Sequence, residues 1–132
     1  MVGLANSIIK RNREGKVSYP IVIAGHSVGG QEAPQFANAL AKAGIPVALV
    51  IGVDPGFAPP PTFNAGSPRV IELLDQGQRP LTIPTAPAAD FSGSITNINI
   101  RDFGSTVDHV GIDKDPKVQS RIISNVLAVV GR

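Results

Sequence analysis

The stretch IVIAGHSVGG, residues 21–30, decides the fold of this 132-residue chain. Four apolar residues, 21–24, run directly into a turn that contains three glycines and one serine. Small apolar residues at helical spacing follow without a break and stop at Gly44. A buried strand that turns directly into a helix is the basic unit of an α/β protein with a parallel sheet. We therefore expect a strand over 21–25 and a helix over 28–43.

Two further strands are expected, over 47–53 and 95–100. The first is apolar throughout, which is typical of a parallel strand with helices on both faces. In the second, isoleucine alternates with asparagine, which favours a position nearer the edge of the sheet. The first strand, the helix and the strand over 47–53 form a right-handed β–α–β unit. The expected fold class is α/β, with helices on both faces of a short, mainly parallel sheet in a three-layer arrangement, as one domain over 1–132.

Three more helices are predicted. Residues 2–14 read as an amphipathic helix, and residues 69–75 as a short one. The last helix has a clear start, because Asp115 is a good N-cap and Pro116 fits the first helical position. Its buried face is expected to consist of four residues spaced four apart: Val118, Ile122, Val126 and Val130.

The segment 55–94 is rich in proline, glycine and serine on either side of the short helix. Two irregular loops that bracket a helix are typical of a lid over a pocket, so we expect a lid-like insertion here. Ordinary packing of the loops on the surface is the alternative.

The turn after the first strand has the pattern Gly-x-Ser-x-Gly, with Ser27 at its centre. A sharp strand-to-helix turn of this kind holds a serine in a strained backbone position with its hydroxyl exposed. We expect positions 25 and 29 to require glycine, because a side chain at either position would clash across the turn. The amide of Val28 would lie at the helix N-terminus, where it can bind a developing oxyanion. A phosphate-binding glycine turn is the alternative, but no lysine follows Gly30 and the serine replaces the second glycine of a dinucleotide motif.

Ser27, Asp54 and His109 follow predicted strands in this order along the chain. The carboxyl ends of parallel strands meet at one edge of a sheet, so residues far apart in sequence can meet there. Such a triad supports nucleophilic catalysis, in which the serine attacks a carbonyl carbon, the histidine transfers the proton and the aspartate orients the imidazole.

Each partner of the serine has alternatives. Asp102, at the end of the third predicted strand, is the alternative acid, and Asp90 is a further candidate. Asp108 is disfavoured because it neighbours the histidine that it would have to orient. Taken singly, Asp54 is also a turn residue and His109 a surface loop histidine.

The second histidine, His26, adjoins the serine. Adjacent residues do not readily present their side chains for an in-line proton transfer. We therefore expect His26 to support the turn by packing.

The segments GHSVGG (25–30), VDP (53–55) and DHVGID (108–113) resemble the α/β-hydrolase superfamily, and its thioesterase and esterase branches in particular. The resemblance covers about residues 17 to 130 and corresponds to the carboxyl-terminal half of that fold. It implies a serine-dependent acyl hydrolase that acts on a small-molecule ester or thioester. In the thioesterase branch the acid can follow the strand next to the serine strand, as Asp54 does.

The early strands of that superfamily, and the loop that gives its second oxyanion donor, have no counterpart in these residues. The chain is therefore either a fragment of a longer polypeptide or a minimal version that completes its site differently. Without a neighbour, strand 21–25 is an apolar edge, and we expect a second copy of the chain or a missing amino-terminal segment to cover it. Two other functions remain open: a non-catalytic binding or assembly remnant, and an acyltransferase that uses the same triad.

Composition excludes several other classes. Twelve basic and ten acidic residues are scattered along the chain without aromatic interleaving, so no nucleic-acid partner is expected. Cysteine is absent, which excludes disulfides and thiolate metal sites, and no metal or organic cofactor is implied. No apolar run reaches the length of a membrane span and no signal-peptide pattern opens the chain, which leaves the cytoplasm as the default compartment.

Overall fold

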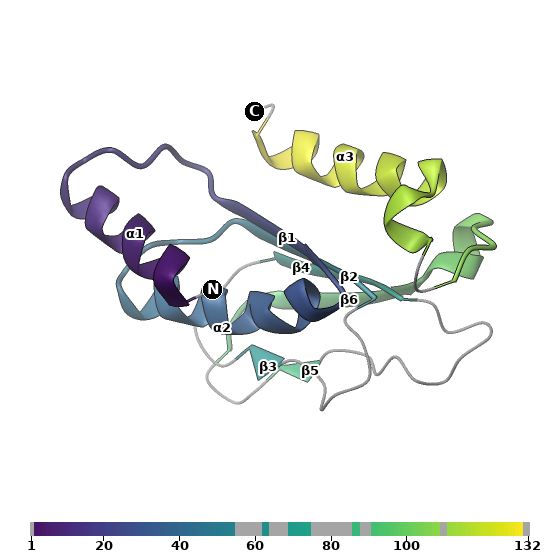
Figure 1. Ribbon diagram of the computed structural model, residues 1–132, viewed down its shortest axis with the longest axis horizontal. Helices are drawn as coiled ribbons and strands as arrows, with labels where there is room; N and C mark the ends of the chain where they lie inside the picture. Colours follow the sequence, from purple (N-terminus) through teal and green to yellow (C-terminus); the bar gives the residue numbers. More distant parts are fainter. Residues whose placement is uncertain are drawn as a thin grey trace.

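Four parallel strands form the central sheet of the computed structural model (Figure 1). The strands are β1 (Val22–His26), β2 (Leu49–Val53), β4 (Arg69–Leu74) and β6 (Ser94–Asn99), in the spatial order β1-β2-β4-β6. Helices α1 (Val2–Arg13) and α2 (Val28–Lys42) lie on one side of the sheet, and α3 (Pro116–Val130) lies on the other. The expected α/β class and its three layers are confirmed.

The structure describes residues 2–54, 62–63, 69–74, 86–87, 91–108 and 111–130. Within these ranges there are also a small parallel sheet and two short 3-10 helices. These elements are β3 (Thr62–Phe63), β5 (Ala86–Pro87), η1 (Ile100–Phe103) and η2 (Ile112–Lys114).

The β1–α2–β2 unit forms as the sequence predicts. The two strands pair in parallel, with Val22 beside Leu49 and His26 beside Val53. Helix α2 packs close to the sheet because small residues, Ala33 and Ala37, face it, and both are fully buried. β1 lies at one edge of the sheet and β6 at the other, as the sequence also predicts.

Residues 69–74 form the central strand β4, so the predicted short helix over 69–75 is wrong. Five of the six residues of β4 are buried, because neighbouring strands pair on both sides and helices cover both faces. A short apolar run of this kind has no periodicity that separates a buried strand from a buried helix. These residues therefore belong to the sheet and not to a lid, and most of the remaining residues of the segment 55–94 lie outside the described ranges.

Two apolar clusters hold the layers together, one on each face of the sheet. The first joins β1, β2 and β4 to α1 and α2, and includes Leu40 and Val50, both fully buried. The second joins the opposite face of the sheet to the segment from η1 to α3, and includes Ile71, Ile112 and Val118. Burial of a large aliphatic side chain contributes about 1.5–3 kcal/mol, so these clusters supply most of the stabilisation of the fold.

Helix α3 buries a different face from the predicted one at its C-terminal end. Val118 is fully buried and Val126 packs on the same cluster, as expected, but Val130 is 45% exposed and Val129 packs in its place. Each residue of an α-helix turns by about 100°, so a spacing of four drifts by about 40° per step and leaves the buried face after three steps. Ile123 and Leu127 also lie outside the buried face of α3 and are exposed.

A buried carboxylate lies in the middle of the sheet. Glu72 of β4 is paired in register with Gly52 of β2 and is 0% exposed. Its carboxylate lies directly over Gly52, where a Cβ would overlap it and would lie 2.7 Å from Oε1. A glycine at position 52 is therefore required by the space that the glutamate occupies.

We expect Gly52→Ala to destabilise the fold by about 2 kcal/mol or more, because the Cβ must displace a buried side chain. Urea unfolding measures the loss of unfolding free energy in each variant. The double variant Gly52→Ala with Glu72→Ala should lose at least about 1 kcal/mol less than the two single losses added together, because the two side chains compete for the same space. Gly29→Ala is the matched control, because a Cβ there meets no atom of the described part of the chain within 4 Å, and it should be neutral or slightly stabilising. Additive losses would show that the two residues do not compete for space.

Candidate functional site

Ser27 has an unusual backbone at the point where β1 turns into α2. Its φ is 55° and its ψ is −117°, which is the conformation of the first central residue in a type II′ turn. Glycine normally occupies that position, and a residue with a side chain is strained there by about 1–3 kcal/mol. The strained turn predicted for this serine is confirmed.

Ser27 is also the N-cap residue of α2, but its side chain forms no capping hydrogen bond. A serine at this position ordinarily accepts a hydrogen bond from the first turn of its helix. The turn instead fixes the residue through its backbone, whose N–H donates to the carbonyl of Val53 at 3.1 Å. The hydroxyl of Ser27 is therefore not used to stabilise the helix that it precedes.

Val28 is the first residue of α2, as expected. Its N–H belongs to the first turn of the helix, where the N–H groups have no acceptor within the helix. Its position next to the serine is the one that the expected oxyanion donor requires. The predicted clash across the turn is wrong for Gly29, since a Cβ there would meet no atom of the described residues within 4 Å.

Asp54 lies beside Ser27 at the same edge of the sheet. His26 and Val53 are paired in register, so the next residue of each strand, Ser27 and Asp54, follows at the neighbouring strand ends. Neighbouring strands lie about 4.8 Å apart. Asp54 is 1% exposed, and its N–H donates to the carbonyl of Leu73 at 2.8 Å.

Ser27 and Asp54 are the two non-glycine residues with positive φ in the described part of the chain; φ is 44° at Asp54. Such conformations cost free energy and persist only where the surrounding structure imposes them. Both residues follow the carboxyl ends of adjacent strands, which marks this end of the sheet as the candidate site.

The rival acids are placed less favourably or lie outside the described ranges. Asp102 is exposed in η1, which follows β6, and β6 is three strand positions from β1, or about 14 Å. Asp108 is exposed, and its Oδ1 accepts a hydrogen bond from the Gly111 N–H at 3.0 Å. Asp90 is not among the described residues.

His109 also lies outside the described residues, but three contacts are described in the segments on either side of it. At the base of the loop, the Ser105 hydroxyl donates to Oδ2 of Asp115. Nearer the histidine, Asp108 accepts from the Gly111 N–H. The third contact joins the loop to the serine strand.

This third contact pairs His26 with Asp113 of η2, with 3.9 Å between Nδ1 and Oδ2. It is an ion pair when the imidazole is protonated. The histidine that we expect to support the turn by packing thus contacts the loop segment that follows His109. No pattern in the sequence indicated this pairing, because residues 26 and 113 belong to elements that are distant in the chain.

Arg101 supports the same loop from η1. Its guanidinium donates to the carbonyls of Ser105 at 3.2 Å and Val107 at 2.9 Å. Because both acceptors are backbone atoms, these hydrogen bonds fix the path of the chain between η1 and His109.

Sequence reasoning missed one candidate acid. Asp75 directly follows β4 in the sequence, and β4 is adjacent to β2. The sequence pattern predicts a helix over 69–75 and so gives no sign of a strand end before Asp75. Asp75 lies outside the described residues, and its position after a central strand is the reason to include it beside Asp54.

Comparison of the chain with models of known protein families, with curated proteins and with solved structures finds no match. The geometry therefore establishes the class of the fold, an α/β protein with a four-stranded parallel sheet flanked by helices. In the described ranges, no group of three metal-ligating side chains is close enough to hold a metal ion. None of the helices described here has the length and hydropathy needed to cross a membrane.

Asp115 provides a test of the loop base. The Ser105 hydroxyl, then the Lys117 N–H at 3.0 Å and the Lys117 charge, hold the pKa of Asp115 below its ordinary value of 3.8. A folded-state pKa below the unfolded one gives stability above the unfolded value that is lost as the pH falls through the folded value. We therefore expect Asp115→Asn, which keeps a capping oxygen, to make the loss of stability between roughly pH 5 and 2 less steep.

Urea unfolding at a series of pH values measures this change. Ser105→Ala should raise the pKa of Asp115, and NMR of the Asp115 carboxyl carbon measures this pKa. Ser124→Ala, at an exposed serine of α3, is the matched control. If the stability of Asp115→Asn falls as steeply with decreasing pH as that of the wild type, the lowered pKa of Asp115 is contradicted.

Proposed function

We propose that this protein is a serine-dependent acyl hydrolase that acts on a small-molecule ester or thioester. The observation that carries the proposal is the backbone of Ser27, a non-glycine residue at φ 55° and ψ −117° between a parallel strand and a helix. This is the setting in which α/β-hydrolases present a nucleophilic serine. The strain has no structural purpose in capping α2, since the serine side chain does not cap it.

In the proposed reaction, the Ser27 hydroxyl oxygen attacks the carbonyl carbon of the substrate. His109 accepts the hydroxyl proton and later donates it to the departing alkoxide or thiolate. Asp54 orients the imidazole and stabilises its charged form. The Val28 N–H donates to the carbonyl oxygen as negative charge develops on it. Water then releases the acyl group by the same steps, with His109 as the base.

The loop contacts support the place of His109 in this scheme. Asp113 follows His109 by four residues and contacts His26, the neighbour of the serine. Four residues of chain span at most about 14 Å. The described segment that follows His109 is thus tied to the strand end that carries Ser27.

We expect Ser27 to react covalently with a fluorophosphonate probe and to hydrolyse a short p-nitrophenyl ester. Ser27→Ala should abolish both signals, and Ser92→Ala, at an exposed serine just before β6, should leave both unchanged. Of Asp54→Asn, Asp75→Asn and Asp102→Asn, the first should lower turnover most, by up to about 10⁴-fold, because it disturbs the histidine. Absence of Ser27-dependent labelling in the folded protein would overturn the proposal and favour a non-catalytic binding module.

Labelling of Ser27 without ester hydrolysis would point to the acyltransferase alternative, which uses the same triad with another acceptor than water. Adding an alcohol or amine acceptor to the ester assay would then restore turnover. The covalent and hydrolytic readouts therefore separate the three candidate functions.

We further propose that a second copy of the chain covers the free edge of β1. An apolar groove of about 260 Å³ follows this edge. The described residues that line it all have apolar side chains: Leu4, Ile8, Ile21, Val22, Ile23, Ala24 and Phe36. Unpaired main-chain groups next to apolar surface favour pairing with another strand, and a two-fold copy offers the same edge in return.

Light scattering should then give twice the mass of one chain. Ala24→Lys places a charge on the exposed edge and should yield a monomer, because lysine on an edge strand opposes pairing. Ala43→Lys, at an exposed position after α2, is the matched control and should remain dimeric. A wild-type monomer would refute pairing with a second copy and leave the edge to an additional amino-terminal segment.

A further inference from the structure

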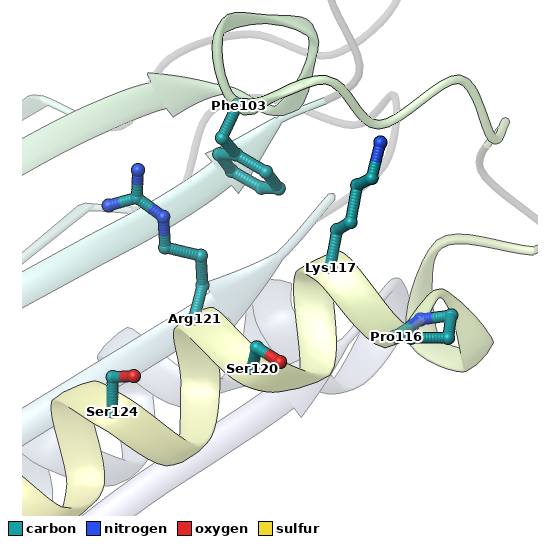
Figure 2. A pocket seen from close by; sticks show the side chains of 6 residues that line it. All are labelled: Phe103, Pro116, Lys117, Ser120, Arg121 and Ser124. Atoms are coloured by element: carbon teal, nitrogen blue, oxygen red, sulfur yellow. The ribbon is translucent and has the colours of Figure 1, made fainter.

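A second concave site lies between η1 and the first half of α3 (Figure 2). The pocket is shallow and open to solvent, with a volume of about 390 Å³. Its lining residues are Phe103, Pro116, Lys117, Ser120, Arg121 and Ser124. Neither Ser27 nor Asp54 lines it, so the pocket is separate from these two proposed catalytic residues.

Two cationic side chains in this pocket are held in place by the protein. Lys117 and Arg121 are one helical turn apart and both extend from α3 toward η1 (Figure 2). The Nζ of Lys117 donates to the Gly104 carbonyl at 2.8 Å. The guanidinium carbon of Arg121 lies 4.9 Å from the centroid of the Phe103 ring. Side chains that are already ordered lose less conformational entropy when a ligand binds.

No acidic residue is among the described residues that line the pocket. Among the described residues, neither Lys117 nor Arg121 forms an ion pair with a carboxylate. The carboxylate closest in sequence, Asp115, already accepts hydrogen bonds from the Ser105 hydroxyl and from the Lys117 N–H. Two of the three donors of the Lys117 ammonium and the fork of the Arg121 guanidinium are therefore directed to solvent or to a ligand.

The remaining lining residues supply donors and an apolar wall. Ser120 and Ser124 are also one turn apart, and both are exposed on the side of α3 that faces the pocket (Figure 2). Their hydroxyls add two hydrogen-bond donors to those of the cations. The ring of Phe103 and the ring of Pro116 form the apolar part of the lining.

We propose that this pocket binds a phosphate monoester that carries an apolar group. A phosphate monoester has a charge of about −1.5 to −2 at pH 7 and three strong acceptor oxygens. Two cations and two hydroxyls match this charge and these acceptors, whereas a carboxylate or sulfate monoanion would neutralise only one of the cations. The apolar wall then receives the group to which the phosphate is attached.

Exposed basic residues on a helix commonly bind nothing but water, and α1 provides an internal comparison. Lys10 and Arg13 are exposed basic residues of α1, one turn apart, and they line neither pocket described here. They carry the same charge as the pocket pair without the held geometry. A variant of this pair therefore separates a built site from general attraction of anions.

The test is a titration of the folded protein with phenyl phosphate, followed by calorimetry and by amide NMR. We expect saturable binding with the largest shifts at η1 and the start of α3. Lys117→Gln combined with Arg121→Gln should weaken binding by at least about tenfold, since hydrogen bonds to charged groups are lost. Lys10→Gln combined with Arg13→Gln should leave the affinity unchanged, and Ser27→Ala should bind as tightly as the wild type.

Equal weakening by the two double variants, or no saturable binding by the wild type, would overturn the proposal. Phenyl sulfate binding as tightly as phenyl phosphate would overturn the assignment to a dianion. Vesicles that contain phosphatidic acid present the same phosphate monoester on a lipid. Binding of either probe that depends on Lys117 and Arg121 supports the site. Tighter binding of phenyl phosphate indicates a soluble ligand, and tighter binding of the vesicles indicates a lipid. Urea midpoints of all variants exclude loss of folding as the cause.

Discussion

The candidate site depends on one backbone hydrogen bond, from the Ser27 N–H to the Val53 carbonyl. It continues the parallel pairing of β1 and β2 one residue beyond β1, into the turn. The serine is thereby held at the strand end while the chain reverses into α2. The same pairing sets Asp54 at the neighbouring strand end, where a second hydrogen bond, from its N–H to Leu73, fixes it against β4. The two strained residues are thus side by side because the sheet register makes them so.

The elements that the sequence predicts well are those with local signals. A glycine turn between an apolar run and small residues at helical spacing defines β1 and α2, and Asp115 with Pro116 marks the start of α3. Strand β4 was not predictable, because a run buried on all sides has no periodicity and the identity of its neighbours is tertiary information. The burial of Glu72 has the same origin, since its place over Gly52 follows from strand pairing.

The sequence predicts a site residue only where it also predicts the end of the strand before that residue. Ser27 and Asp54 each follow a strand that the sequence predicts, whereas the strand before Asp75 has a pattern that also fits a helix. The pairing of His26 with Asp113 joins elements separated by most of the chain, so no local pattern carries it. The C-terminal end of the α3 face was misplaced because a repeat of four residues does not match a turn of 3.6.

The order of the sheet also has a consequence for how the molecule is made. β1 pairs with β2 across a separation of 27 residues, and it has no other strand partner among the described residues. Long-range parallel pairing requires closure of an intervening loop before any ladder bond forms, which slows folding. During synthesis, Ser27 leaves the ribosome well before Val53, whose carbonyl holds its backbone. The strained conformation is therefore acquired only when the first β–α–β unit closes, and the nascent segment around the serine is chemically ordinary until then.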